Sequence, residues 1–399
     1  MTTEHGNLLV VDDNEMNRDM LSRRLARKGH TAEVAEDGQR ALEMVQETDY
    51  DVILLDIMMP WIDGYQVLEK LREDHDSGDL PVIMATAKDA SEDVVAALKL
   101  GANDYVTKPF DFPVVLARVQ TQLQLKRSRQ ALASAHLRMK KDLEAAARIQ
   151  ASLLPPDQVV DIGGDTIAWR YVPCDELAGD TLGIVQLDEQ TVGVYVVDVS
   201  GHGVPSALLS VSLSRVLTSE PTSSVLWTTD PGATEPRFAS PVEVMTELSK
   251  RFPYDMQTGQ YFTMVYAVID LGSRTLTYAS AGHEPMIVVG AGRDPELGAS
   301  TGQPIALVPA MIMESTYEER SIDLRAGDRL YLYSDGIPEA RDADGEQWGN
   351  ERLAAKLTSL LGTGLDDGLP DILETVRQFQ GGPHFDDDVS ILGVEINAE

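Results

Sequence analysis

Aspartates stand next to short apolar runs at several places along this 399-residue chain. In the N-terminal part, Asp12 and Asp13 follow one such run, Asp56 ends another and Lys108 follows a third. Carboxylates that converge repel one another unless a divalent cation lies among them, and a hard, oxygen-binding ion such as Mg²⁺ suits this ligand set. A lysine beside them adds a cation that can hold a phosphoryl oxygen. These residue types therefore indicate phosphoryl chemistry at a magnesium site.

Further acidic clusters lie beyond residue 155. They read Ala178-Gly179-Asp180, Asp198-Val199-Ser200-Gly201-His202-Gly203, Ser334-Asp335-Gly336 and Asp386-Asp387-Asp388. An Asp-Gly pair is usually a turn, so Ser334-Asp335-Gly336 taken alone predicts only a turn. Together, aspartates with almost no accompanying histidine or cysteine favour Mg²⁺ or Mn²⁺ over Zn²⁺. Two such ions bridged by a carboxylate can lower the pKa of a shared water and align its attack, so phosphoester hydrolysis is the expected chemistry.

Short apolar runs alternate with helix-like stretches from residue 7 to about residue 120. The expected strands are 8–11, 32–35, 52–55, 82–85 and 104–106, with helical stretches such as 16–28 and 90–100 between them. This rhythm predicts an α/β fold, a doubly wound parallel sheet with five strands and five helices. Ligands of such a sheet bind at the carboxyl ends of the strands, where the acidic residues and Thr86 would meet.

The segment 112–153 has Pro113 near its start and then no glycine or proline before Pro155. It can therefore form one continuous helix of roughly 40 residues, ~60 Å long. One heptad seam of this helix holds Leu125, Leu132, Met139, Ala146 and Leu153, while the companion seam holds Arg129, His136, Leu143 and Gln150. The second seam is a poor coiled-coil core, so a parallel dimer and a monomeric helix packed on its own domains both stay open.

The remaining chain predicts an α+β domain of packed β-sheets flanked by helices. Its expected strands are 191–197, 264–269, 275–279, 329–333 and 389–394, and its expected helices are 207–218, 241–251 and 353–361. The stretch 217–241 is rich in Ser, Thr and Pro, which predicts a loop or flap with an exposed aromatic side chain at Trp227.

Composition restricts the partners and the compartment. The 65 acidic and 33 basic residues give a net charge of −32, which disfavours binding to nucleic acid and to an anionic membrane surface. The single cysteine, Cys174, offers no disulfide framework and is expected to be a small buried side chain. There is no signal-like N-terminus and no run of ~18 apolar residues, so a cytoplasmic protein is expected.

The N-terminal motifs VVDD, LLDIMMP, ATA and TKPF, in this order and at these separations, resemble the flavodoxin-like receiver domain of two-component response regulators over about residues 6–125. The resemblance implies that Asp56 accepts a phosphoryl group from a sensor histidine kinase or phosphotransfer protein. It also implies that Asp13, Asp56 and the Met58 carbonyl bind Mg²⁺ with help from Asp12, and that Lys108 contacts the phosphoryl oxygens. Thr86 and Tyr105 match the family's switch pair, although Tyr105 is equally well explained as an ordinary core aromatic.

The later motifs AARIQASLLP, ELAGD, DVSGHGVPSALLS, YFTMVYAVID, YASAGHEP, YLYSDGIPEA and DDDVSIL resemble the SpoIIE-type branch of the metal-dependent PPM (type 2C) Ser/Thr protein phosphatases over about residues 145–396. The resemblance implies two Mn²⁺ or Mg²⁺ ions. Asp198 would bridge them, the Val199 carbonyl would bind one, Asp335 and Asp387 would complete the other shell, and Asp180 would bind directly or through water.

Four further positions in or near these motifs, Asp386, Asp388, Gly183 and His202, also have predicted roles. Asp388 is a weaker ligand candidate than Asp387, and Asp386 is expected only to be solvated. Gly183 stands where many family members have another aspartate, which would weaken metal binding at that corner. His202 is interpreted either as a proton donor to the leaving serine oxygen or as a residue that orients the metal loop.

The expected organisation is a receiver domain at 1–124, a helical linker with a possible coiled coil at 125–154 and a phosphatase domain at 155–399. Phosphorylation of Asp56 would control a phosphatase whose substrate is a phosphoserine anti-sigma factor antagonist of the STAS type, and the chain would form a homodimer through the linker helix. The rival hypotheses are a non-catalytic adaptor and a receiver-controlled nucleotide cyclase. The cyclase lacks the glycine-rich, basic phosphate loop that it would require.

Overall fold

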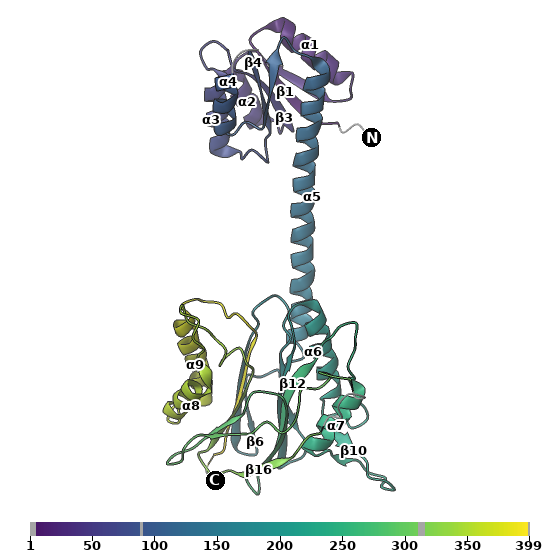
Figure 1. The fold of residues 1–399 in the computed structure, drawn as a ribbon, viewed down its shortest axis with the longest axis vertical. Coiled ribbons are helices and arrows are strands. Elements are labelled where there is room, and N and C mark those ends of the chain that lie inside the picture. The colour runs from purple at the N-terminus through teal and green to yellow at the C-terminus, as the bar shows by residue number, and fades with distance from the viewer. Residues whose placement is uncertain (1–4, 88–90, 310–315, 398–399) are drawn as a thin grey trace. The chain divides into compact units, whose positions relative to one another are not determined.

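The structure is a computed structural model that describes residues 5–87, 91–309 and 316–397. The chain divides into two compact units, residues 1–140 and 141–399 (Figure 1). Helix α5, Phe112–Ala151, is continuous across this boundary, as the absence of glycine and proline from its interior predicts.

The N-terminal unit is a five-stranded parallel sheet in the order β2-β1-β3-β4-β5. Its elements are β1 (Asn7–Val11), α1 (Glu15–Ala26), β2 (Thr31–Ala35), α2 (Gly38–Glu47), β3 (Val52–Asp56), α3 (Gly64–Asp74), β4 (Val82–Ala87), α4 (Ser91–Lys99), β5 (Asp104–Lys108) and the start of α5. This strand order is that of the flavodoxin-like doubly wound fold, so the predicted fold class is confirmed.

Both faces of this sheet are covered by helices. One hydrophobic cluster joins the strands to α2, α3 and α4, and the other joins them to α1 and α5. On the second face, Val115, Val119 and Leu123 of α5 are buried at helical spacing. The strands β1 and β3 are therefore almost fully buried, which explains why they read as continuous apolar runs in the sequence.

The described residues of the C-terminal unit form two large antiparallel sheets and the two-stranded sheet β10-β11. The first has the order β16-β13-β12-β9-β8 and the second the order β15-β14-β17-β18-β7-β6. The strands are β6 (Val159–Ile162), β7 (Asp165–Val172), β8 (Thr181–Gln186), β9 (Thr191–Val199), β10 (Trp227–Thr228), β11 (Arg237–Phe238), β12 (Phe262–Asp270), β13 (Thr275–Ala281), β14 (Ile287–Val289), β15 (Glu296–Leu297), β16 (Arg320–Asp323), β17 (Arg329–Tyr333) and β18 (Val389–Glu395). The helices are α6 (Val204–Val216), α7 (Pro241–Arg251), α8 (Gly349–Ser359) and α9 (Leu365–Gln380).

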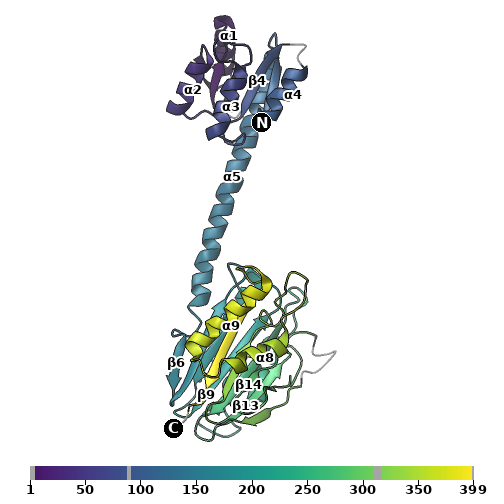
Figure 2. The ribbon, with the colours of Figure 1, turned by 90° about the vertical axis from the view of Figure 1, so that its left-hand side faces the viewer.

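The two sheets pack face to face, and helices cover their outer faces (Figures 1 and 2). Alternate residues of β9 show the arrangement: Val192, Val194 and Val196 lie in the cluster between the sheets, whereas Tyr195 and Val197 face α6 and α7. A third cluster joins the six-stranded sheet to α8 and α9. The expected α+β domain of packed sheets flanked by helices is thus confirmed.

Two local features differ from the sequence analysis. Trp227 is only half-exposed, because β10 and β11 form a short hairpin in which its ring lies 4.6 Å from that of Phe238. Cys174 is half-buried rather than fully buried. No helix in the described ranges is long and apolar enough to cross a membrane.

Gly183 has a packing role that the sequence does not reveal. It pairs with Tyr195 across β8 and β9, and a Cβ atom at Gly183 would lie 2.4 Å from the Tyr195 ring. The Tyr195 ring belongs to the cluster on the helix side of the sheet. The space that a side chain at position 183 would need is therefore filled by an aromatic ring.

Substitution Gly183→Ala should lower the free energy of unfolding of the C-terminal unit by about 1–3 kcal/mol, the usual cost of forcing an extra methyl group into a packed site. Urea denaturation followed by tryptophan fluorescence measures the change. Gly362→Ala is the control, because a Cβ atom there meets no atom within 4 Å. Equal stability of the two variants would contradict this account of Gly183.

Candidate metal centres

Asp12, Asp13 and Asp56 meet at the carboxyl edge of the parallel sheet. One carboxylate oxygen from each lies within 4.8 Å of the others. Asp12 and Asp56 are buried, whereas Asp13 is exposed. The Asn14 amide donates to the Asp12 carboxylate at 2.9 Å and the Asn17 side chain donates at 3.1 Å, which fixes its orientation. This is an oxygen-only donor set of the kind that Mg²⁺ prefers.

Lys108 supplies a positive charge to this cluster. Its ammonium group lies 2.5 Å from Asp56 Oδ2 and 2.8 Å from Asp12 Oδ2. Burial raises the pKa of the Asp56 carboxyl above its ordinary value, although Lys108 opposes this shift. Burial also opposes the charged form of Lys108, but its contacts with Asp12 and Asp56 leave the pKa of the ammonium raised. The lysine thus stays protonated and holds two carboxylates together.

The other receiver positions lie around this edge. Thr86 is buried on β4, while Tyr105 on β5 is half-buried against the hydrophobic cluster beneath α2, α3 and α4. The backbone amide of Met58 donates to Asp56 Oδ1 at 3.4 Å, and the Met58 side chain is exposed. Thr86 and Tyr105 are therefore on neighbouring strands, as a switch pair requires, and the packing of Tyr105 also fits an ordinary core aromatic.

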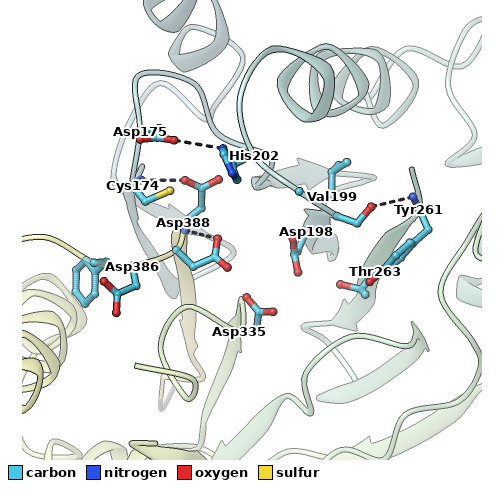
Figure 3. Close-up of a pocket in the computed structure, with 14 residues that line it drawn as sticks. Cys174, Asp175, Asp198, Val199, His202, Tyr261, Thr263, Asp335, Asp386 and Asp388 are labelled. Carbon is cyan, nitrogen blue, oxygen red and sulfur yellow. Dashed lines mark hydrogen bonds and ion pairs between the residues drawn. The ribbon is translucent and has the colours of Figure 1, made fainter. Parts of the chain in front are cut away.

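In the C-terminal unit, Asp198, Val199, Asp335 and Asp387 line one cavity of about 530 Å³ (Figure 3). Asp198 and Val199 end β9, Asp335 follows β17 and Asp387 precedes β18. Figure 3 shows the carboxylates of Asp198 and Asp335 pointing into the same space. Segments almost 190 residues apart in the chain thus bring their acidic side chains to a single cavity.

Mutual repulsion is a defining property of this cavity. Burial, and then the charges of Asp335 and Asp387, raise the pKa of Asp198 to about 8. Burial and Asp387 raise the pKa of Asp335 to about 6, and burial raises that of Asp387. No lysine or arginine lines the cavity in the part of the chain that the structure describes. Divalent cations would relieve this repulsion, so the donor set fits them.

Asp180 lies behind the cavity wall and is buried. Its Oδ2 accepts a hydrogen bond from Ser390 Oγ at 2.8 Å, and its backbone carbonyl accepts one from Ser210 Oγ at 3.3 Å. Burial and the charge of Asp198 raise the pKa of its carboxyl well above the ordinary value. The charge of Asp198 therefore acts on Asp180, although Asp180 is not among the residues that line the cavity.

Asp388 has a clear structural contribution. Its carboxylate accepts from the backbone amides of Cys174 and Gly179, at 2.9 and 2.7 Å. These bonds tie the segment that precedes Asp180 to the start of β18. The carboxylates of Asp387 and Asp388 and the Cys174 thiol also lie within 4.8 Å of one another. Neighbouring Asp386 is exposed, as expected of a solvated side chain.

Two glycines allow the acidic segments to approach so closely. A Cβ atom at Gly179 would lie 2.6 Å from the Val199 carbonyl oxygen, and one at Gly336 would lie 2.2 Å from that of Asp388. Backbone contacts of this kind leave no room for any side chain. Glycines next to Asp180 and Asp335 therefore permit the cavity to form.

The histidines of the motifs differ in exposure. His202 is exposed at the cavity, and its Nδ1 lies 3.5 Å from Asp175 Oδ2. His283 is buried, its Nδ1 lies 2.7 Å from Thr263 Oγ1, and burial lowers its pKa to about 4. His283 thus supports the strand that carries Thr263, whereas His202 remains accessible.

The sequence analysis missed two residues that act on this site. Glu284 accepts from the Asn350 side chain at 2.9 Å, and its charge adds to the other influences that raise the pKa of Asp198 and Asp335. Gln150, at the end of α5, is bonded to the segment before Asp180. Two sequence features could have identified these residues. Glu284 is the acidic residue that follows His283 in the motif YASAGHEP, and Gln150 is a polar residue in a heptad seam where an apolar one is expected.

Comparisons with known proteins find one family in the N-terminal part of the chain and another in the C-terminal part. Residues 8–120 match the family model of the response regulator receiver domain, and residues 188–397 match that of stage II sporulation protein E (SpoIIE). The response regulator MprA of Mycobacterium ulcerans is 44% identical over 117 residues, which are 29% of this chain and 50% of MprA. The transcriptional regulatory protein PcoR of Escherichia coli is 41% identical over 125 residues, 31% of this chain and 54% of PcoR. The chain thus spans about half the length of these relatives.

Among solved structures, the SiaA-PP2C domain of Pseudomonas aeruginosa superposes with a TM-score of 0.54 at 20% identity. The match covers 66% of this chain and 99% of that domain. At this level of identity the similarity shows the fold.

Mn²⁺ should bind the C-terminal cavity more tightly at pH 8 than at pH 6. Cations bind ionised carboxylates, and the pKa values of about 8 for Asp198 and about 6 for Asp335 place their ionisation in this window, so binding releases protons. Calorimetric titration in buffers of different ionisation enthalpy counts these protons. Asp198→Asn, which leaves the N-terminal cluster intact, is the control and should lose most of the pH dependence. Wild-type binding that is independent of pH would refute the assignment.

Proposed function

Because the chain belongs to the SpoIIE family of PPM phosphatases and carries a receiver domain at its N-terminus, we propose that it is a response regulator in which Asp56 controls hydrolysis of a phosphoserine protein. The observation that carries the proposal is the cavity lined by Asp198, Asp335 and Asp387. The charges of Asp335 and Asp387 raise the pKa of Asp198, and no lysine or arginine among the described residues that line the cavity balances them. An oxygen-only site of this kind suits a pair of Mn²⁺ or Mg²⁺ ions.

In this proposal Asp198 would help to hold both ions, the Val199 carbonyl would hold one, and Asp335 and Asp387 would hold the other. Asp180 binds directly or through water. When bound, the ions would lower the pKa of a shared water and neutralise phosphate oxygens. The protein's own contribution is to hold these oxygens in place, through the hydrogen bond from Ser390 to Asp180 and the anchoring of the neighbouring segment by Asp388.

The receiver half takes up the phosphoryl group on Asp56 from a sensor histidine kinase or phosphotransfer protein. Asp13, Asp56 and the Met58 carbonyl would hold Mg²⁺ with help from Asp12. The Lys108 ammonium group lies 2.5 Å from Asp56 Oδ2, so it would contact an oxygen of a phosphoryl group attached to Asp56. Thr86 and Tyr105 would then change position and alter the surface of the receiver.

The end of α5 offers a route from the receiver to the cavity. Gln150 Nε2 donates to the Ala178 carbonyl at 2.6 Å, and the Ala178 amide donates to Gln150 Oε1 at 3.3 Å. Gln150 also lies 3.4 Å from Ser210 Oγ, which donates to the Asp180 carbonyl. A shift of α5 would therefore act directly on the segment that carries Asp180.

The finer parts of the proposal are the substrate and the assembly. The substrate would be a phosphoserine anti-sigma factor antagonist of the STAS type. Leu125, Leu132 and Met139 are exposed on α5, which supports a homodimer formed through this helix. The rival adaptor hypothesis does not explain why the chain has all four acidic residues Asp180, Asp198, Asp335 and Asp387.

Asp198→Ala should lower kcat/KM for Mn²⁺-dependent hydrolysis of a phosphoserine protein at least ~100-fold, because the carboxylate shared by both ions is lost. Phosphate release measures the rate. Asp386→Ala is a matched control, since Asp386 lines the same cavity but is not one of the proposed ligands, and it should retain activity. Full activity of Asp198→Ala would overturn the site. A wild-type chain that neither binds Mn²⁺ nor turns over substrate would favour the adaptor.

Gln150→Ala should raise the Mn²⁺ concentration needed for half-maximal activity by about 2- to 10-fold, the range that corresponds to one or two lost hydrogen bonds. Activity at saturating Mn²⁺ should persist. The change in activity on adding beryllofluoride, which mimics the phosphoryl group on Asp56, should also shrink. Ile149→Ala, an exposed neighbour on the same helix, is the control. A Gln150→Ala variant that behaves like wild type in both assays would refute this route.

A further inference from the structure

Three highly exposed, large apolar side chains lie in the segments that directly follow Asp12 and Asp13 after β1 and Asp56 at the end of β3. Trp61 is 87% exposed, Met16 is 81% exposed and Met58 is 77% exposed. Met58 follows Asp56 by two residues, and its amide donates to Asp56. Met16 lies in the first turn of α1, directly after the Asn14 cap that donates to Asp12. We refer to Met16, Met58 and Trp61 as the apolar rim.

Trp61 is held outward by a well-defined loop. The Gly64 amide closes this loop by donating to the Ile57 carbonyl at 2.9 Å, and a Cβ atom at Gly64 would lie 2.3 Å from the Asp56 carbonyl oxygen. Met59 is buried within the loop, and Ile62 packs against the hydrophobic core. Met59 and Ile62 are directed inward, whereas the Trp61 side chain is left in solvent.

The backbone of Trp61 is also strained. Its φ angle is +64°, in the left-handed region that bulky side chains disfavour by roughly 1–2 kcal/mol. A glycine would adopt this conformation freely. A large apolar side chain therefore occupies a position where folding alone favours glycine, and where exposure removes any benefit from core packing.

We propose that the apolar rim is a docking surface for the protein that donates the phosphoryl group to Asp56, with Trp61 as its anchor. A protein donor must bring its phosphohistidine to a buried carboxylate, so its surface has to cover the residues around that carboxylate. Exposed tryptophans that become covered in this way are frequent binding hot spots. Asp13 and Glu15 lie exposed beside the rim, so the matching surface would be apolar with basic residues at its edge.

The transfer itself needs no group from Trp61. A carboxylate oxygen of Asp56 attacks phosphorus, the new O–P bond forms as the N–P bond of phosphohistidine breaks, and the imidazole nitrogen keeps the electron pair and takes a proton from water. A small donor such as acetyl phosphate can reach Asp56 without touching Trp61. The rim should therefore matter for protein donors alone, which separates docking from chemistry. This inference rests on the proposed phosphorylation of Asp56.

The test compares two donors on the full-length chain. The protein donor is the purified, autophosphorylated histidine kinase that labels the wild-type chain fastest in a panel of kinases from the same organism, and the small donor is acetyl phosphate. Trp61→Ala should lower kcat/KM for phosphotransfer from the kinase by on the order of tenfold or more, mainly through KM. The rate with acetyl phosphate should stay within about twofold of wild type.

Trp61→Gly provides a second variant that should fold at least as well, because glycine relieves the strained φ angle. It should show the same selective loss, and Trp61→Phe should recover part of it. Leu98→Ala is the matched control, since Leu98 is an exposed apolar residue in the last turn of α4, which runs back from the edge that carries Asp56.

Equal loss with both donors would overturn the docking proposal and assign Trp61 to the chemistry. Unchanged transfer from the kinase would also overturn it. A change in sedimentation of Trp61→Ala, without a selective loss of kinase transfer, would instead assign the rim to a second copy of the chain. Absence of Asp56 labelling by either donor in the wild type would be a failure of the proposed function and not of the rim.

Discussion

Repulsion between neighbouring carboxylates is the constraint on which the C-terminal unit depends. Asp198, Asp335 and Asp387 face one cavity, where the charges of Asp335 and Asp387 disfavour ionisation of Asp198 and that of Asp387 disfavours ionisation of Asp335. The fold enforces this arrangement through close backbone contacts, because Gly179 abuts the Val199 carbonyl and Gly336 abuts that of Asp388. Carboxylates gathered in this way destabilise the fold when no cation balances their charges, and bound cations would remove this destabilisation.

The segment that carries Asp180 connects this centre to the rest of the chain. Its backbone is bonded by Asp388 from β18, by Ser210 from α6 and by Gln150 from α5. All three of these partners are polar and buried, so they can exchange hydrogen bonds without exposing the hydrophobic core. Hydrogen bonds therefore link the segment that carries Asp180 to the end of α5.

The sequence predicted elements whose local pattern matches their final environment. Buried strands such as β3 and β17 were found because each is a short run of mainly apolar and aromatic residues with a single charged residue at one end. Helix α9 was not found, because Gly368 and Pro370 near its start are ordinary turn signals, and the helix tolerates them within its first two turns. The acidic motifs located the cavity, but the anchoring by Asp388, the influence of Glu284 and the packing of Tyr195 against Gly183 arise from contacts between segments distant in sequence.

The two acidic clusters differ in one respect: the N-terminal one contains its own counterion. Lys108 bridges Asp12 and Asp56, whereas the described lining of the C-terminal cavity includes no such ammonium group. Scarcity of magnesium and manganese in a cell would therefore affect the two halves unequally. Without cations, the carboxylates of the N-terminal cluster would still be partly balanced by Lys108, whereas those of the C-terminal cavity would repel one another with no lysine or arginine in the described lining to balance them.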